Sequence, residues 1–216
     1  MWESLPSYHH NAFRLTDCLF VVMISFRRKF SNFFYRNLVG NKILKNDEIL
    51  DGNRVWFISD THFGHRNIIR WCRSEYFKNL HQMHERLVSN WNYNVSNNDR
   101  VFCLGDFGDF RLKRRLKGRI TIAKGNHDKR QWNRQYILKY RDMKFLVLHD
   151  PDNATSWFDG DWIIHGHHHV NSPFINIAKK RVNVSCEMIN FTPITMEKIY
   201  SIIQESKNYK DDRWYL

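Results

Sequence analysis

The sequence predicts an α/β fold, and three observations support this prediction. Short apolar runs rich in β-branched and aromatic residues recur from Arg54 onward, and each stops at a polar residue. Segments with helical spacing lie between some of these runs. The 216 residues are 42% hydrophobic and 26% charged, with 9 glycines and 4 prolines. This composition excludes disordered and collagen-like chains and suffices for one domain with a core.

Five of the apolar runs are predicted to be buried strands with polar residues at their carboxyl ends. They cover residues 55–59, 100–104, 120–124, 145–148 and 162–164. A hairpin is predicted farther along, over 174–177 and 181–185, because Lys179 and Lys180 interrupt two apolar runs there. Ligands of α/β sheets gather just beyond the carboxyl ends of the strands, so the polar residues at those ends are expected to converge.

Helical periodicity is found in three stretches. The longest has its apolar residues on one face of a 3.6-residue repeat: Leu80, Met83, Leu87, Val88, Trp91 and Val95. Leu112 and Leu116 indicate a shorter helix. A last helix is predicted over 195–206, with Thr195 as its N-cap and Met196, Ile199, Tyr200 and Ile203 on its inner face.

Nine polar residues follow the predicted strands: Asp60, His62, Asp106, Asn126, His127, Asp128, His149, His167 and His169. They offer carboxylate, imidazole and amide oxygen but no thiolate. This mixture suits divalent ions such as Mn, Fe, Ni or Zn in a reactive site and disfavours a structural zinc site. Two ions need about seven or eight protein ligands with one carboxylate shared between them, and the set supplies that number.

In chain order these residues form five blocks: Asp60-Thr61-His62, Gly105-Asp106, Gly125-Asn126-His127-Asp128, His149 and Gly166-His167-His168-His169. The pattern D-x-H, G-D, G-N-H-D, H and G-H-x-H resembles that of the calcineurin-like metallophosphoesterase superfamily, over roughly residues 54–204. Each block alone is common, but five in order are specific. The resemblance implies two packed mixed β-sheets flanked by helices, the four-layer sandwich of that superfamily.

The resemblance also implies a role for each residue. Seven would bind two divalent ions, with Asp106 bridging both: Asp60, His62 and His169 for one ion, and Asn126, His149 and His167 for the other. Mn is the expected metal, ahead of Fe, Ni or Zn. His127 would donate a proton to the leaving oxygen, and Asp128 would orient its ring. The implied reaction is hydrolysis of a phosphate ester, by a phosphodiesterase or a phosphatase.

Some polar residues beside the blocks match no ligand position. His168 is expected to point away from the metals or to contact substrate. For His165 two readings stay open, contact with a ligand residue or plain surface. Asp109 is expected to be a solvated loop carboxylate, and His65 lies where a phosphate-contacting group would sit.

The charge balance bears on the substrate. The chain has 34 Lys plus Arg against 22 Asp plus Glu, a net charge of +12, which favours polyanions such as nucleic acid and anionic membrane surfaces. A dense basic run spans residues 111–119 and is either a solvated helix face or a contact for nucleic acid or polyphosphate. Trp71, Trp91 and Trp132 either stack bases or fill the core. Nucleotides, nucleic acid and small phosphorylated compounds all remain candidate substrates.

A second class of function stays open beside the enzyme. Some proteins share a fold with an enzyme but only bind a partner, so the alternative is a nucleic-acid or protein-binding module on a non-catalytic metallophosphoesterase fold. Such a scaffold would normally have lost ligands or the histidine of G-N-H-D, and here none is lost.

Residues 1–52 fall outside the resemblance and are predicted to be an extension ending in a linker, which leaves 53–216 as the metallophosphoesterase domain. Helical spacing from Leu19 to Phe33, interrupted by Arg27-Arg28-Lys29, indicates a basic amphipathic helix that either packs on the domain or docks to a membrane surface or a partner protein. No apolar run approaches the roughly 20 residues of a membrane-spanning helix. Four cysteines without a CxxC pair suit a reducing compartment, so a cytoplasmic location is expected.

Overall fold

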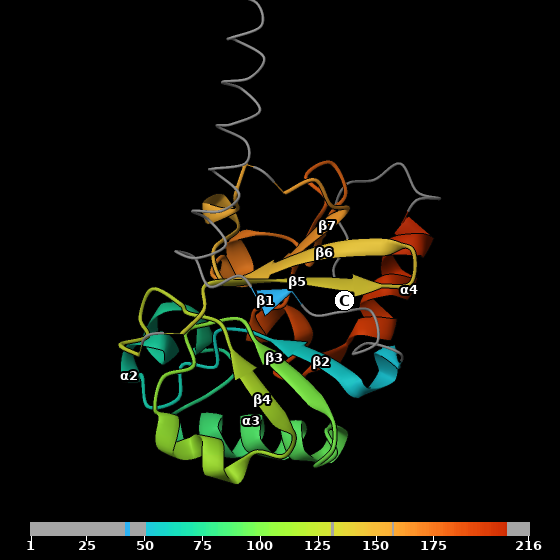
Figure 1. The fold of residues 1–216 in the computed structure, drawn as a ribbon. Helices are drawn as coiled ribbons and strands as arrows, with labels where there is room; N and C mark the ends of the chain where they lie inside the picture. Colours follow the sequence, from blue (N-terminus) through green and yellow to red (C-terminus); the bar gives the residue numbers. More distant parts are fainter. Residues whose placement is uncertain (1–41, 44–50, 131, 157, 207–216) are drawn as a thin grey trace, which may run out of the picture. The chain divides into compact units, whose positions relative to one another are not determined.

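Two β-sheets organise the part of the chain that the structure describes (Figure 1). The structure is a computed structural model, and it describes residues 42–43, 51–130, 132–156 and 158–206. The helix predicted between Leu19 and Phe33 lies outside these residues. The predicted class, α/β with two mixed sheets flanked by helices, is confirmed.

The smaller sheet has four strands in the order β10-β2-β3-β4. Strands β2 (Val55–Ile58), β3 (Arg100–Cys103) and β4 (Arg119–Ile122) are parallel to one another. The short β10 (Ile194–Thr195) is antiparallel to β2. The carboxyl ends of the three parallel strands therefore lie at the same edge of the sheet, as the sequence predicts.

The larger sheet has six strands in the order β1-β5-β6-β7-β9-β8. Strands β6 (Met143–Leu148), β7 (Trp162–His165) and β9 (Arg181–Asn183) are parallel. β8 (Ile175–Asn176) forms the predicted hairpin with β9. β5 (Gln135–Tyr140), which is absent from the predicted strands, is antiparallel to β6.

β1 (Lys42–Ile43) is parallel to β5 at the other end of this sheet. These two residues belong to the segment predicted as an extension. The division at residue 52 stays a prediction, but the pairing shows that the larger sheet includes residues that precede it.

Two long helices flank the sheets. α3 (Leu80–Asn94) begins at Asn79, whose side chain accepts a hydrogen bond from the Gln82 N–H, and lies by β3 and β4 (Figure 1). α4 (Met196–Ser206) packs beside β2 and β10, and its predicted N-cap Thr195 accepts a hydrogen bond from the Lys198 N–H. In the described part of the chain, none of the helices is long and apolar enough to cross a bilayer.

Short helical turns connect the strands. α2 (Arg66–Ile68) continues directly into the π-helical turn η3 (Ile69–Arg73). The helix predicted around Leu112 and Leu116 is a 3-10 helix, η4 (Phe110–Arg115). The other 3-10 turns are η2 (Gly52–Arg54), η5 (Pro151–Asn153), η6 (His169–Asn171) and η7 (Cys186–Ile189).

An apolar core joins the two sheets. Phe57 of β2 stacks on Phe102 of β3 with ring centroids 5.5 Å apart, and Phe102 meets Tyr136 of β5 edge to face at 5.8 Å. Phe57 and Phe145 of β6 are fully buried. Each such ring removed from water contributes roughly 1.5–3 kcal/mol, so the core fixes the sheets against each other and thereby fixes the loops at their carboxyl ends.

Candidate metal centre

The loops that follow β2 and β3 stay paired beyond the strands. The Asp60 N–H donates to the Gly105 carbonyl at 3.1 Å, and the His62 N–H donates to the Asp106 carbonyl at 2.9 Å. The larger sheet joins at Ser59, whose N–H donates to the Val184 carbonyl at 2.9 Å. Backbone hydrogen bonds therefore bring the ends of β2, β3 and β9 together before any side chain is considered.

Five of the predicted ligand residues have a left-handed backbone. Their φ angles are 59° for Asp60, 48° for His62, 49° for Asp106, 68° for His167 and 45° for His169. Non-glycine residues adopt this region rarely, at a cost of order 1–3 kcal/mol each, and such residues concentrate at functional sites. The turns they make aim all five side chains back toward one place.

Asp60, His62 and His169 form one group of converging ligand atoms, here called the inner cluster. Asp60 Oδ1 lies 3.9 Å from His62 Nε2 and 3.7 Å from His169 Nε2. Asp60 Oδ1 and His62 Nε2 are buried and have no hydrogen-bond partner among the described residues. Buried polar atoms normally have a hydrogen-bond partner. A cation between these two atoms would supply the partner that they lack.

Asn126, His149 and His167 form a second group, the outer cluster. His149 Nε2 lies 2.8 Å from Asn126 Oδ1 and 3.2 Å from His167 Nδ1. His149 donates its Nδ1–H to the Leu104 carbonyl at 2.8 Å, so its Nε2 carries a lone pair. Two acceptors, Nε2 and the amide oxygen, thus face each other at hydrogen-bond distance. A divalent cation fits this arrangement as well.

Asp106 lies between the two clusters. Its Oδ2 is 3.7 Å from His62 Nε2 and 3.5 Å from His149 Nε2, so one oxygen faces a member of each. Its Oδ1 accepts a hydrogen bond from the His127 N–H at 2.9 Å. The position is that of the bridging carboxylate expected from the sequence, and the role itself stays a proposal.

Two glycines make room for Asp106 and His149. A Cβ atom at Gly125 would collide with the Asp106 carboxylate. At Gly105, where φ is +92°, it would lie 2.7 Å from His149 Nδ1. Only glycine permits both the backbone conformation and the close approach.

Burial sets the ionisation of the inner cluster. Burial alone would raise the pKa of Asp60, but the adjacent His149, His169 and His62 lower it to about 2. Burial lowers the pKa of His62 to about 3. At neutral pH the pair is therefore a carboxylate beside a neutral imidazole, the forms that bind a metal ion.

His127 is more exposed than these ligands. Its side chain is 52% exposed, with Nε2 4.0 Å from Asp106 Oδ2. The His127 ring lies 5.6 Å from the rings of both His62 and His65. An imidazole that is open to solvent beside the two clusters can reach a bound substrate.

Asp128 follows His127 in the loop after β4, and its expected role of orienting the His127 ring stays a prediction. Its carboxylate accepts hydrogen bonds from the backbone N–H groups of Asp106 at 2.8 Å, Phe107 at 3.1 Å and Gly125 at 2.9 Å. Both oxygens are thereby engaged, and among the described residues no hydrogen bond links Asp128 to the His127 ring. Asp128 fastens the loop after β4 to the loop after β3.

Two residues that the sequence does not predict to be part of the site lie behind His169. Glu187 of η7 accepts a hydrogen bond from His169 Nδ1 at 3.1 Å, and His169 Nε2 faces Asp60 Oδ1 at 3.7 Å. The Arg73 guanidinium donates to Glu187 at 2.6 Å and to the carbonyl oxygens of Asp60 and Thr61. The side chains of Arg73 and Glu187 are both fully buried. This carboxylate–histidine pair is the arrangement that orients metal-binding histidines.

The electrostatics of this group follow from its contacts. Burial alone would raise the pKa of Glu187, but Arg73 and His169 lower it to about 2. Burial would lower the pKa of His169, but its contacts with Cys72, Glu187 and Asp60 raise it to about 10. Cys72 is a free thiol whose Sγ lies 3.5 Å from Glu187 Oε1.

The remaining predicted neighbours lie away from the ligand atoms. His165 is buried, not at the surface, and its Nδ1–H donates to the Gly166 carbonyl at 2.8 Å. Burial lowers its pKa to about 4. His168 Nε2 lies 3.8 Å from Asp152 Oδ2 at η5. Asp109 caps η4, accepting from the Arg111 N–H.

The described residues form an α/β protein of two sheets, with two groups of potential metal ligands that share Asp60: Asp60, His62 and His169, and Asp60, Asp106 and His149. Residues 54–185 match the model of the calcineurin-like phosphoesterase superfamily domain, and the chain belongs to that family. The family resemblance seen in the five sequence blocks is thus confirmed.

Two further proteins are similar to this chain. The chain is 40% identical over 168 residues to an uncharacterized protein, MJ1445, of Methanocaldococcus jannaschii, covering 71% of this chain and 93% of that protein. The crystal structure of AQ665, a protein of unknown function from Aquifex aeolicus, is 24% identical and covers 69% of this chain and 98% of that one, with a TM-score of 0.56. The second likeness shows the shared fold.

Proposed function

We propose that this chain hydrolyses phosphate esters and that it does so with two divalent ions, Mn ahead of Fe, Ni or Zn, held by the inner and outer clusters. Membership of the phosphoesterase family supports a phosphate-ester substrate. Two pairs of polar atoms carry the proposal, because the two atoms of each pair face each other without a donor between them. Asp60 Oδ1 and His62 Nε2 are buried and have no hydrogen-bond partner among the described residues, and His149 Nε2 lies 2.8 Å from Asn126 Oδ1.

When bound, two such ions supply the Lewis acidity and the charge that in-line displacement at phosphorus needs. The chain's own contribution is positional. Asp106 presents one oxygen to both clusters while its other oxygen is tied to the His127 N–H. The His167 N–H donates to Asp60 Oδ2 at 2.9 Å, which connects a residue of the outer cluster to a residue of the inner cluster.

His127 is the proposed proton donor. A simple alkoxide is a poor leaving group, so hydrolysis needs an acid beside the leaving oxygen. The His127 side chain is the exposed imidazole next to Asp106, whereas His62 and His149 are buried. The nearby His62 and His65 rings restrict the orientation of the His127 ring, a role that is also predicted for Asp128.

The test uses the full chain loaded with Mn and two generic substrates, an aryl phosphomonoester and an aryl phosphodiester. We expect turnover of at least one, and the ratio of the two rates will define the chain as a phosphatase or a phosphodiesterase. His127→Ala should retain metal and lose about 10²–10⁴-fold in kcat, the usual contribution of a general acid. Asp106→Ala should lose metal.

Metal content, measured by elemental analysis after dialysis, separates the outcomes. Undiminished turnover in both variants would reject the site. A wild-type chain that binds two ions yet turns over neither ester would favour the alternative, a binding module on a non-catalytic form of the fold.

A further inference from the structure

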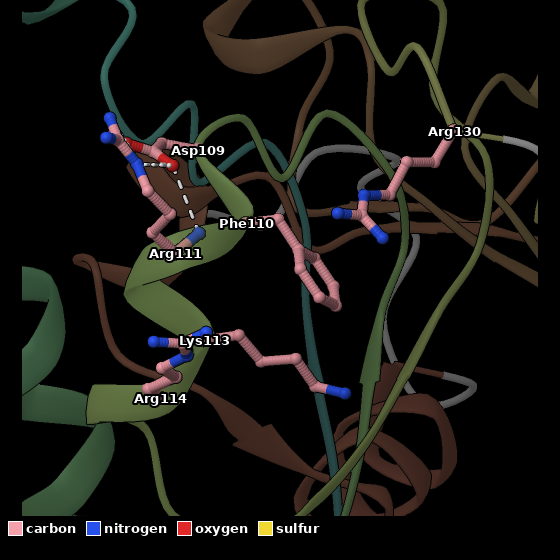
Figure 2. A pocket seen from close by; sticks show the side chains of 6 residues that line it. All are labelled: Asp109, Phe110, Arg111, Lys113, Arg114 and Arg130. Carbon is pink, nitrogen blue, oxygen red and sulfur yellow. Dashed lines mark hydrogen bonds and ion pairs between the residues drawn. The ribbon is translucent and has the colours of Figure 1, made fainter.

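A cavity of about 580 Å³ adjoins η4 and is lined by Asp109, Phe110, Arg111, Lys113, Arg114 and Arg130 (Figure 2). In Figure 2 the Phe110 ring projects between the side chains of Arg130 and Lys113. The Arg130 guanidinium lies 4.1 Å from the ring centroid and the Lys113 ammonium 5.3 Å. These cation–π contacts hold the two cations in place before a ligand arrives.

The cavity has a net positive charge. Its one carboxylate, Asp109, is neutralised by a bidentate pair with Arg111, at 3.0 and 2.7 Å. Among the described residues, no carboxylate pairs with Lys113, Arg114 or Arg130. Three cations without counter-charges around one hollow favour a ligand with several negative charges.

Both walls of this cavity lie within a few residues of the metal centre along the chain. Asp109 and Phe110 come three and four residues after Asp106, and Arg130 comes three residues after His127. Three residues span at most about 10–11 Å. A substrate with its reacting phosphate beside His127 can therefore place a neighbouring phosphate among these cations.

An exposed aromatic ring also stands at the metal centre. Trp71, in the π-helical turn η3, is 64% exposed, whereas Trp91 is fully buried and Trp132 packs against Phe110 and the core. The Trp71 ring meets the His65 ring at 5.3 Å, and His65 in turn lies 5.6 Å from His127. Of the three tryptophans that the sequence offered for base stacking, Trp71 is the one free to do so.

We propose that the substrate is single-stranded nucleic acid, with the phosphate next to the reacting one bound by Lys113, Arg114 and Arg130 and an unpaired base stacked on Trp71. This inference rests on the proposed function, because it assumes that a phosphodiester reacts beside His127. A single strand offers both regularly spaced phosphates and open base faces, whereas a duplex hides its bases.

The experiment measures binding of a fluorescent phosphorothioate-linked 12-nucleotide strand to the full, Mn-loaded chain over a range of salt. We expect log K to fall with log salt with a slope of about −0.7, from the one phosphate that the three cations neutralise. Arg130→Gln should weaken binding about five- to tenfold and make the slope shallower. Trp71→Leu should weaken binding about tenfold and leave the slope unchanged, because stacking releases no counterions.

Two matched variants serve as controls. Arg115 belongs to the same basic run but is paired with Glu85 at 2.8 Å, and Tyr93 is an aromatic residue 90% exposed on α3. Arg115→Gln and Tyr93→Leu should change neither affinity nor slope. Wild-type binding by both Arg130→Gln and Trp71→Leu would overturn the inference. So would equal competition by a duplex or a nucleoside triphosphate.

Hydrolysis of the aryl phosphodiester distinguishes failure of this inference from failure of the proposed function. If that small ester is hydrolysed while the 12-nucleotide strand shows none of the expected binding, the substrate class is wrong and the proposed function stands. If the strand binds as expected and no phosphate ester is hydrolysed, the binding site stands and the proposed function fails.

Discussion

The inner and outer clusters differ in their burial and in the residues that support their ligands. Asp60 and His62 are 0% and 2% exposed, and His169 is backed by the buried pair of Glu187 and Arg73. In the outer cluster Asn126 is exposed and His167 half-buried. Buried charged residues support the inner cluster, whereas Asn126 of the outer cluster lies on a loop that is fastened mainly through backbone N–H groups.

This difference suggests a division of labour. Ligands whose own partners are fixed lose little freedom when a metal ion binds. The inner cluster should therefore bind the tighter ion and contribute to stability. The outer cluster, beside exposed His127, should adapt to the substrate at a cost in affinity for its ion.

The largest expected effect is on stability, from Arg73→Met. Removing Arg73 leaves the Glu187 carboxylate buried without its counter-charge, and breaking such a pair costs about 3–5 kcal/mol. Urea unfolding should show this loss in the free energy of unfolding. Arg115→Met, which breaks the exposed pair with Glu85, is the control and should cost less than about 1 kcal/mol. Equal losses in the two variants would mean that the buried pair does not stabilise the inner cluster.

A double variant sharpens this result. Arg73→Met with Glu187→Gln removes both charges, and removing both partners of a buried pair costs less than removing one. We expect partial recovery, because the carbonyl oxygens of Asp60 and Thr61 still lose their donor. A double variant less stable than Arg73→Met alone would contradict the account.

The next effect separates the two clusters by metal affinity. His62→Ala should lower the affinity for the tighter-binding ion by more than about 100-fold. This exceeds the 10–100-fold that residues behind the ligands usually contribute. His167→Ala should leave that ion bound and lower the affinity for the second ion. Calorimetric titration with Mn would show which binding step each variant loses. Loss of the tight step in His167→Ala alone would reverse the assignment.

A smaller effect is expected from Glu187 acting through His169. In the double variant, His169 keeps a hydrogen-bond partner but loses the negative charge that orients it and increases its basicity. Affinity for the tighter ion should fall about 10–100-fold. Co-substituted protein provides a second readout, since the visible spectrum should shift with the ligand field of His169. An unchanged spectrum and affinity would leave Glu187 a purely structural role.

The sequence predicts much of the fold because strands with polar carboxyl ends are a local pattern. The predicted strand 55–59 is β2, Val55–Ile58, and the predicted helix from Leu80 is α3. β5 is not predicted because its run is followed by Arg141, in a tight turn, and not directly by a metal-binding residue. It therefore lacks the pattern that identifies the other strands.

The chemistry of the site is only partly local. The family resemblance implies that Asp128 orients the His127 ring, and the structure adds that its carboxylate lies against backbone N–H groups 21 and 22 residues earlier in the chain. Arg73 and Glu187 pair across 114 residues, and nothing in the sequence near either one indicates the other. Such contacts depend on how the sheets pack, which periodicity does not reveal.

The smallest expected effect concerns Asp109, which follows the Gly105-Asp106 block closely but is expected from the sequence to be a solvated loop carboxylate. Its carboxylate caps η4 and pairs with Arg111, which is 88% exposed. Asp109→Asn keeps the cap, since asparagine caps about as well as aspartate, and loses an exposed ion pair worth at most about 1 kcal/mol. Mn affinity at both steps should match the wild type, because the carboxylate is committed to the surface arginine. A tenfold loss at either step would place Asp109 among the ligands and extend the outer cluster toward the basic cavity.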